Sequence, residues 1–193
     1  MQSSETSDKR DITHRVELLA PAGDWEALKA ACACGADAVY FGLPVLNARL
    51  RAGNFQLSDL PALMEYLHIR NVRGYLAMNT LVYQHELAEA QRAVAEAARA
   101  SVDALIVQDY GLAVMARRMV PSLKLHASTQ MTLSSPGAIA HAAKLGFSRV
   151  ILPREIPLAE IRKIAAETGI ELEVFVHGAL CISYSGQCQA SLA

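Results

Sequence analysis

One histidine and two cysteines fall within a short segment near the end of the chain. His177 follows an alternating apolar run, and Cys181 and Cys188 come after it, seven positions apart. The run predicts a strand that delivers an imidazole and two thiols into one glycine-containing loop. Iron–sulfur clusters take about four thiolates, and this spacing is not that of a zinc ribbon. Three interpretations stay open: buried structural thiols, half of a metal or iron–sulfur site, and a cysteine nucleophile partnered by His177.

Polar side chains also follow most of the other predicted strands. Guanidinium and amide groups hold anionic substrates, whereas imidazoles and carboxylates move protons. The predicted substrate-binding residues are Arg49, Arg51, Asn79, Gln130 and Arg154. The predicted catalytic residues are His177, His126, Asp109 and Glu155. For His126, a hydrogen-bonded histidine at a strand end is an equally good interpretation.

Seven short apolar runs alternate with six segments that have helical periodicity. The predicted strands cover 16–21, 38–42, 74–78, 104–107, 124–127, 149–152 and 171–176. The predicted helices begin after Asp24 and after Ser58, and then cover 86–100, 111–120, 136–145 and 158–168. Asp24 and Ser58 belong to the residue types that cap helix N-termini. Strands joined by such helices lie parallel, with the helices outside the sheet.

This alternation fits either an open doubly wound sheet or a (β/α)8 barrel. No glycine-rich dinucleotide fingerprint follows the first strand, where Pro21-Ala-Gly-Asp24 stands instead. The polar candidates follow nearly every strand rather than gathering at one crevice, and in a barrel all strand ends meet at the active-site face. We therefore predict an incomplete TIM-barrel-like α/β fold with parallel strands, about seven strands and six helices.

The length sets a limit on that barrel. A complete one has eight strands and about 250 residues, whereas this chain has 193. We expect a disordered lead-in over 1–15 and a barrel domain over 16–193 that is truncated at its C-terminus. The first and seventh strands would then leave an open edge.

Composition narrows the classes of partner and compartment. The formal net charge is −1, with both signs interspersed, unlike a strongly basic nucleic-acid binder. DNA is therefore not expected as a partner, whereas a local basic patch for RNA stays open. No apolar run approaches the roughly 20 residues that span a bilayer, and the polar start is no export signal. We expect a cytoplasmic protein whose cysteines act as thiols or metal ligands rather than in disulfides.

The last predicted strand and its loop resemble the signature of the peptidase U32 (collagenase-like) family. The matching residues are Glu173, Phe175, Gly178, Ala179, Leu180, Cys181, Gly186, Cys188 and Ser191. Segments 17–23, 35–40, 103–109, 126–130 and 154–155 resemble the same family in the same order. The resemblance covers the chain from about Val16 to its end, which comes just after the signature.

This resemblance implies an activity and a cofactor. Bacterial members of the family are described as oxygen-independent hydroxylases that modify a tRNA uridine, a ribosomal RNA cytidine or a ubiquinone precursor. The RNA-modifying members are linked to prephenate as a co-substrate, and an iron–sulfur cluster on four cysteines recurs. By this resemblance Cys181 and Cys188 are two ligands of a four-iron–four-sulfur cluster, and the other two would lie beyond Ala193.

Two alternatives remain beside a hydroxylase. The family name implies a collagenase-like peptidase, although the sequence shows neither a Ser-His-Asp arrangement nor a His-Glu-x-x-His helix. The chain could also be an inactive truncated scaffold that docks a partner, such as a related subunit, through its open edge.

Overall fold

The computed structural model describes residues 16–48, 53–178 and 183–186, so the predicted lead-in over 1–15 lies outside it. Its strands are β1 (Leu19–Pro21), β2 (Ala38–Gly42), β3 (Arg73–Met78), β4 (Ala104–Val107), β5 (Lys124–Ala127), β6 (Arg149–Ile151) and β7 (Glu171–Glu173). Its α-helices are α1 (Trp25–Ala33), α2 (Leu60–His68), α3 (Leu87–Arg99), α4 (Tyr110–Met119), α5 (Pro136–Lys144) and α6 (Leu158–Glu167). Its 3-10 helices are η1 (Leu57–Asp59), η2 (Gln84–Glu86) and η3 (Thr129–Met131). Among the described residues, no helix is long and apolar enough to cross a membrane.

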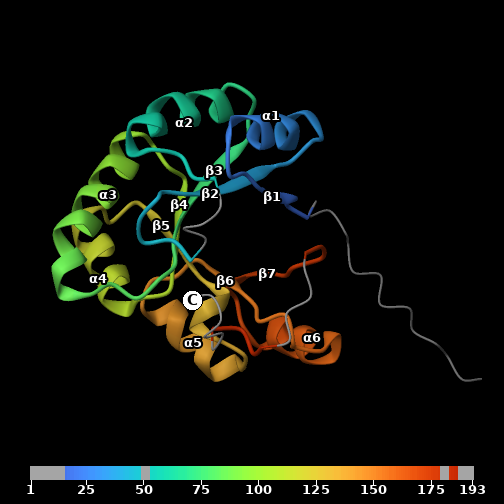
Figure 1. The fold of residues 1–193 in the computed structure, drawn as a ribbon. Helices are drawn as coiled ribbons and strands as arrows, with labels where there is room; N and C mark the ends of the chain where they lie inside the picture. Colours follow the sequence, from blue (N-terminus) through green and yellow to red (C-terminus); the bar gives the residue numbers. More distant parts are fainter. Residues whose placement is uncertain (1–15, 49–52, 179–182, 187–193) are drawn as a thin grey trace, which may run out of the picture.

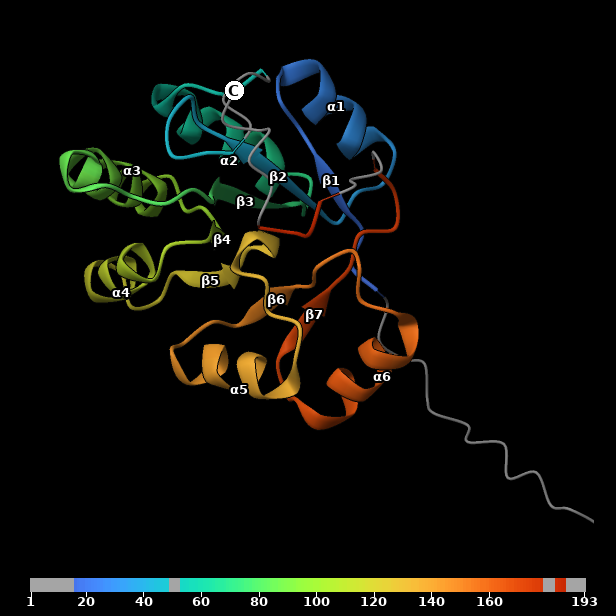
Figure 2. The same cartoon turned by 60° about the horizontal axis from the view of Figure 1, so that its bottom comes forward.

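All seven strands belong to one parallel sheet in which each strand lies beside the next in sequence, from β1 to β7. The sheet curls, and the α-helices surround it on the outside (Figure 1; Figure 2). β1 and β7 are the two ends of the strand order, and within the described part of the chain they do not pair with each other. The predicted incomplete TIM-barrel-like fold is confirmed.

The two faces of the sheet carry different cores, because successive side chains of a strand point to opposite faces. The main core lies between the sheet and the helices and includes Val39, Leu76, Leu105, Leu125 and Val150. A smaller cluster lines the inner face and comprises Ala38, Tyr75, Ala104, Ile106 and Ile151. At Gly74 a Cβ atom would lie 2.4 Å from the Met64 sulfur, so this glycine lets α2 pack closely on β3.

Local polar residues start the first two helices in different ways. Asp24 caps α1 as predicted, since its Oδ1 accepts a hydrogen bond from the backbone N–H three residues on, at 2.8 Å. The predicted Ser58 cap of α2 is wrong. Gln56 starts η1 instead, and its backbone N–H donates to Asp59 Oδ2 at 2.8 Å. This 3-10 turn leads directly into α2, which leaves Ser58 inside the turn.

β7 is shorter than the predicted strand over 171–176. Its last ladder partner is Ile151, which ends β6 and lies opposite Glu173. Beyond that point the chain has no strand of this sheet to pair with among the described residues. Val174 and Val176 are accordingly 44% and 86% exposed, so alternation alone overestimated the strand.

Candidate functional site at the strand ends

Four described residues between the two predicted metal ligands, 183–186, lie at the C-terminal ends of β5 and β6 and form the docked turn. Within it, Ser185 N and Ser185 Oγ each donate a hydrogen bond of 2.9 Å to the carboxylate of Glu155, which follows β6. Thr132 Oγ1, which follows β5, donates to the Ser185 carbonyl oxygen at 2.8 Å. Hydrogen bonds from two neighbouring strand ends therefore hold this turn.

A glycine and an ionised carboxylate maintain this docking. Gly186 has φ +79°, and a Cβ atom there would lie 2.4 Å from the Gln130 carbonyl oxygen, so a side chain would meet both strain and a clash. Burial raises the pKa of Glu155, but the hydrogen bonds from Ser185 outweigh it and leave the pKa below its usual range. The carboxylate is thus charged at neutral pH and accepts both bonds.

Cys181 and Cys188 lie outside the described residues, as do Arg49 and Arg51. The docked turn stands between the two cysteines in the sequence, and Ser185 binds it to the strand ends. Two thiolates at these sequence positions would be half of the roughly four that an iron–sulfur cluster takes. Among the described residues themselves, no three His, Cys, Asp or Glu side chains are grouped to hold a metal ion.

Two of the predicted site residues position neighbouring loops. Asn79 Oδ1 accepts a hydrogen bond from Ala48 N at 3.2 Å, which ties the loop after β2 to the end of β3. Asp109 caps α4, because its Oδ1 accepts from Leu112 N at 2.8 Å. Its Oδ2 accepts from Val82 N at 3.4 Å and so joins the loops after β3 and β4. Both side chains support the strand-end face through backbone contacts.

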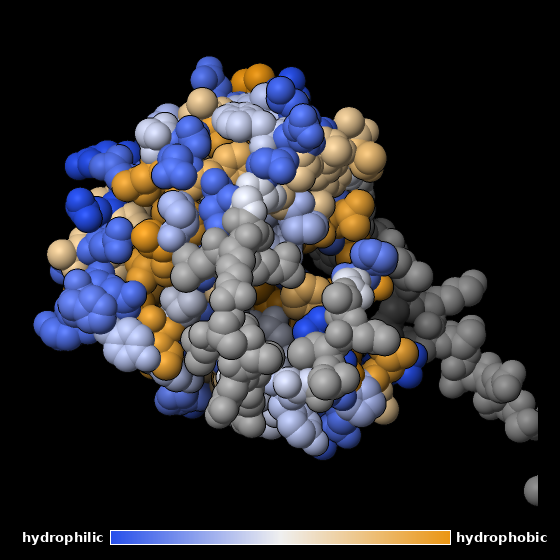
Figure 3. Space-filling model, viewed as in Figure 1, coloured by the Kyte–Doolittle hydropathy of each residue, from blue (hydrophilic) through white to orange (hydrophobic). Residues whose placement is uncertain are grey.

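Three other predicted residues, Gln130, Arg154 and His177, also lie near this face. Gln130 Oε1 is buried and accepts no hydrogen bond from the described residues. The guanidinium of Arg154 lies over the ring of Phe175, 5.6 Å from its centroid, and His177 is exposed beyond β7. Figure 3 views this side of the molecule and shows a hollow near its centre, with apolar and polar side chains around it. The face therefore offers an unpaired acceptor and a cation beside the docked turn.

His126 lies deeper, on the inner face of β5. Its side chain is 2% exposed, and its ring meets that of Tyr75 edge-on with centroids 4.8 Å apart. Burial, followed by the positive charges of Arg149 and Lys124, lowers the pKa of His126 to about 3. The imidazole is therefore neutral, and its Nδ1 has no hydrogen-bond partner among the described residues. A neutral imidazole of this kind can exchange one hydrogen bond with a bound group.

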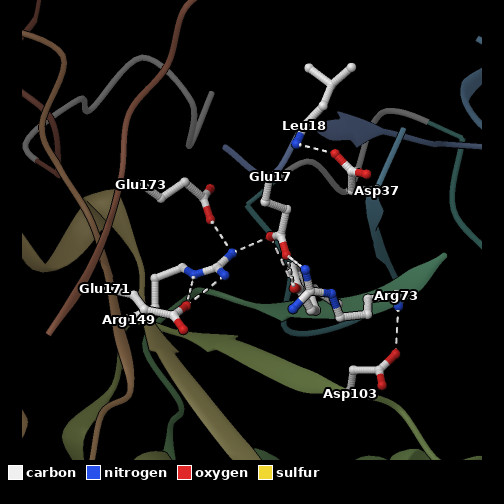
Figure 4. Close-up of polar contacts among 10 residues, drawn as sticks. Glu17, Leu18, Asp37, Arg73, Asp103, Arg149, Glu171 and Glu173 are labelled. Atoms are coloured by element: carbon white, nitrogen blue, oxygen red, sulfur yellow. Dashed lines mark hydrogen bonds and ion pairs between the residues drawn. The ribbon is translucent and has the colours of Figure 1, made fainter. Parts of the chain in front are cut away.

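A charge network on the inner face was not predicted from the sequence (Figure 4). Arg149, whose side chain is 9% exposed, lies 2.6 Å from Glu17 and 2.7 Å from Glu171. Glu173 lies 3.2 Å from the same guanidinium, and Arg73 pairs with Glu17. The sequence feature that could have predicted this network is a charged residue at or just before the start of several apolar strands. In barrels that end of the strands serves stability rather than catalysis.

Comparison with known proteins assigns the family. The model of peptidase family U32 matches residues 23–193. The chain is 40% identical over 181 residues to the 23S rRNA 5-hydroxycytidine C2501 synthase of Escherichia coli K12, covering 94% of this chain and 27% of that protein. It is 35% identical to tRNA hydroxylation protein P1 of Bacillus subtilis 168, covering 98% and 45%. It is 34% identical to a collagenase of Porphyromonas gingivalis W83, covering 91% and 45%.

The fold comparison agrees with this assignment. A solved structure described as a U32 peptidase superposes with a TM-score of 0.70 at 14% identity, covering 89% of this chain and 73% of that one, which supports the fold alone. The chain spans less than half the length of the three relatives named above. Because the family model matches nearly the whole of the described sheet and the cysteine loop, the chain belongs to peptidase family U32.

Proposed function

We propose that this chain provides the barrel part of an enzyme that hydroxylates a base of tRNA or ribosomal RNA. The observation that carries the proposal is the docked turn, which lies between Cys181 and Cys188 in the sequence and is bound to the strand-end face by Glu155 and Thr132. The relatives named for tRNA and rRNA hydroxylation point to the substrate class. An enzyme acting on such RNAs would work in the cytoplasm.

In this proposal Cys181 and Cys188 bind an iron–sulfur cluster, which supplies electron transfer when bound. Cys32 and Cys34 are not expected in this ligand set, because they lie at the C-terminal end of α1, at the end of the sheet opposite the strand-end face. The other ligands would come from outside this sequence, for instance from a related subunit. Glu155 would keep the turn between the two cysteines at the strand ends.

The polar residues of the face would bind and orient the reactants. Arg154, with Arg49 and Arg51, would hold phosphate groups of RNA or the two carboxylates of prephenate as co-substrate. Gln130 offers its unpaired Oε1 to a donor such as an exocyclic amine. His126 would hold one hydrogen bond to a group that enters the barrel, as a neutral imidazole rather than as an acid.

A peptidase is the second candidate, favoured by the collagenase among the relatives. Peptide hydrolysis by a serine or threonine needs a nucleophile within hydrogen-bond reach of a base. Neither His126 nor His177 makes such a bond to a hydroxyl of the described residues, and the hydroxyl of Ser185 is engaged by Glu155. These contacts favour the hydroxylase over a peptidase that uses a serine or threonine of the described residues.

The test compares two cysteine pairs of the same chain. The chain is reconstituted anaerobically with iron and sulfide, together with the subunit that supplies the other ligands. Visible absorbance is measured, as are hydroxylated nucleosides in RNA from cells that lack or carry the gene. We expect the double variant Cys181→Ser, Cys188→Ser to lose both the cluster absorbance and the hydroxylated nucleosides. The double variant Cys32→Ser, Cys34→Ser should keep both. Unchanged cluster absorbance in the first variant would reject the ligand assignment. Hydrolysis of gelatin without any change in nucleosides would favour the peptidase.

A further inference from the structure

The exposed aromatic side chains of this protein all lie at one end of the sheet. All aromatic residues of the sequence fall within the described part of the chain, and most are buried or half-buried. The largely exposed ones are Tyr83 (61%), Tyr110 (48%), Phe175 (44%) and Tyr184 (71%). Each follows the C-terminal end of a strand or belongs to the docked turn. The strand-end face therefore carries all the largely exposed aromatic rings.

These four residues, called the ring arc below, follow the strand order. Tyr83 comes after β3, Tyr110 after β4 and Phe175 after β7. Tyr184 adjoins Ser185, which binds Glu155 after β6. Neighbouring strands lie ~4.8 Å apart, so the arc from β3 to β7 follows roughly 19 Å of the sheet edge. That length accommodates several flat groups side by side.

Two rings of the arc already face flat partners. The ring of Tyr83 lies parallel to that of His85, with centroids 6.0 Å apart and an interplanar angle of 12°. The Arg154 guanidinium lies over Phe175, 5.6 Å from the ring centroid. Stacking and cation–π geometries are thus available at both ends of the arc.

The loops that carry the rings are fixed to the framework. Tyr83 N donates to Glu86 Oε2 at 2.8 Å, and Val82 N donates to Asp109 at 3.4 Å. Tyr184 stands next to the residue that anchors the docked turn. A fixed backbone loses little conformational freedom when a ligand stacks on the ring it carries, which favours a binding role.

We propose that the ring arc binds unpaired bases of RNA by stacking. Bases of single-stranded loops can lie on aromatic side chains and guanidinium planes, whereas a duplex hides their faces. This inference rests on the proposed function for its choice of RNA, and adds the surface and the single-stranded class of substrate. The arc flanks the cysteine loop, so bases stacked on it would present a neighbouring base to that loop.

The test measures binding by the whole chain and does not depend on catalysis. Fluorescence anisotropy is recorded with a labelled RNA hairpin that has a ten-nucleotide loop and with a fully paired duplex of equal length. Stacking contributes about 1–3 kcal/mol per base, so Tyr83→Ala and Phe175→Ala should each weaken hairpin binding roughly 5- to 150-fold. Tyr83→Phe should keep it. Ile69→Ala, at an exposed apolar residue that follows α2 at the other end of the sheet, should change nothing.

The outcomes separate this inference from the proposed hydroxylation. If hairpin binding depends on the rings but no hydroxylated nucleoside is found, the proposed hydroxylation is rejected and the ring arc remains an RNA-binding surface. Hydroxylation with unaltered hairpin affinity in both Ala variants would overturn the inference. It is equally overturned if the chain binds no RNA, or binds duplex as well as hairpin. Ring-dependent binding of gelatin in place of RNA, or ring-dependent self-association in sedimentation, would also overturn it.

Discussion

Glu17 and Arg149 are 132 positions apart in the sequence, yet their charged groups lie 2.6 Å apart on the inner face of the sheet. Glu17 precedes β1, and Arg149 begins β6, next to the edge strand β7. This ion pair therefore spans the side where β1 and β7 do not pair within the described residues. On that side a side-chain ion pair joins the segment before β1 to β6, whereas backbone hydrogen bonds join the neighbouring strands of the sheet.

The first prediction concerns this contact. Arg149→Met keeps an apolar side chain of similar length but leaves Glu17, Glu171 and Glu173 facing one another without a cation. Removing one partner of a buried ion-pair group is strongly destabilising, so we expect a loss of about 3 kcal/mol in the free energy of unfolding. Urea unfolding followed by circular dichroism measures it.

The matched control is Arg99→Met, which removes an arginine from an exposed i,i+3 pair with Glu96 on α3. Exposed pairs contribute little, so the change should stay within about 0.5 kcal/mol. Equal losses in the two variants would show that the inner network contributes no more than a surface pair.

The second prediction is a pH dependence due to His126. A histidine in the unfolded chain has a pKa of about 6.5, whereas in the folded protein that of His126 is lowered to about 3. Between these values the unfolded state binds more protons, so stability falls as the pH falls below about 6.5. The contribution is fully present above that pH and declines by up to about 1.4 kcal/mol per pH unit.

His126→Phe keeps a ring against Tyr75 and removes this titration. Between pH 7.5 and pH 5, wild type should lose about 2 kcal/mol more than the variant in urea unfolding. Burial raises the pKa of Glu173, which acts in the opposite direction, but this contribution is common to both proteins. Parallel stability profiles would contradict the neutral, buried state of His126.

The third prediction concerns the docked turn. Glu155→Ala removes both acceptors of Ser185, and hydrogen bonds to a charged group are worth about 1.5–3 kcal/mol. Amide hydrogen exchange at Ser185 should therefore rise roughly tenfold or more, with little change in global stability. Glu167→Ala, at an exposed carboxylate that ends α6, serves as the control. Since the pKa of Glu155 is lowered, wild-type docking should persist at neutral pH and weaken only as the pH falls below about 4.5.

The fourth prediction separates support from chemistry at Asp109. Asp109→Ala loses the cap of α4 and should cost about 1 kcal/mol of stability, whereas Asp109→Asn can still accept the same bond. If Asp109 acts only by holding loops, Asn should also keep nucleoside hydroxylation. A variant with Asn that melts like wild type but no longer hydroxylates RNA would assign Asp109 a chemical role.

Much of the architecture followed from local pattern. Apolar runs such as Ala104–Val107 and Lys124–Ala127 matched the observed strands because buried strands must be apolar on the face that meets the helices. Strand boundaries that depend on pairing with a neighbour were not predicted correctly. β7, for example, ends at the residue that pairs with the last residue of β6. The Ser58 cap was misplaced because a 3-10 turn, set by Gln56 and Asp59, preceded α2.

By itself the sequence determined the parallel β-α alternation, the strand-end location of the polar residues and the family signature around the cysteine loop. These depend on residue types and spacings that a linear chain displays. Only the tertiary structure decided that Glu155 binds Ser185, that Asp109 caps a helix, and that His126 is buried and neutral. It alone joined Glu17 to Arg149, because hydrogen bonds and desolvation depend on which distant segments the curled sheet brings together.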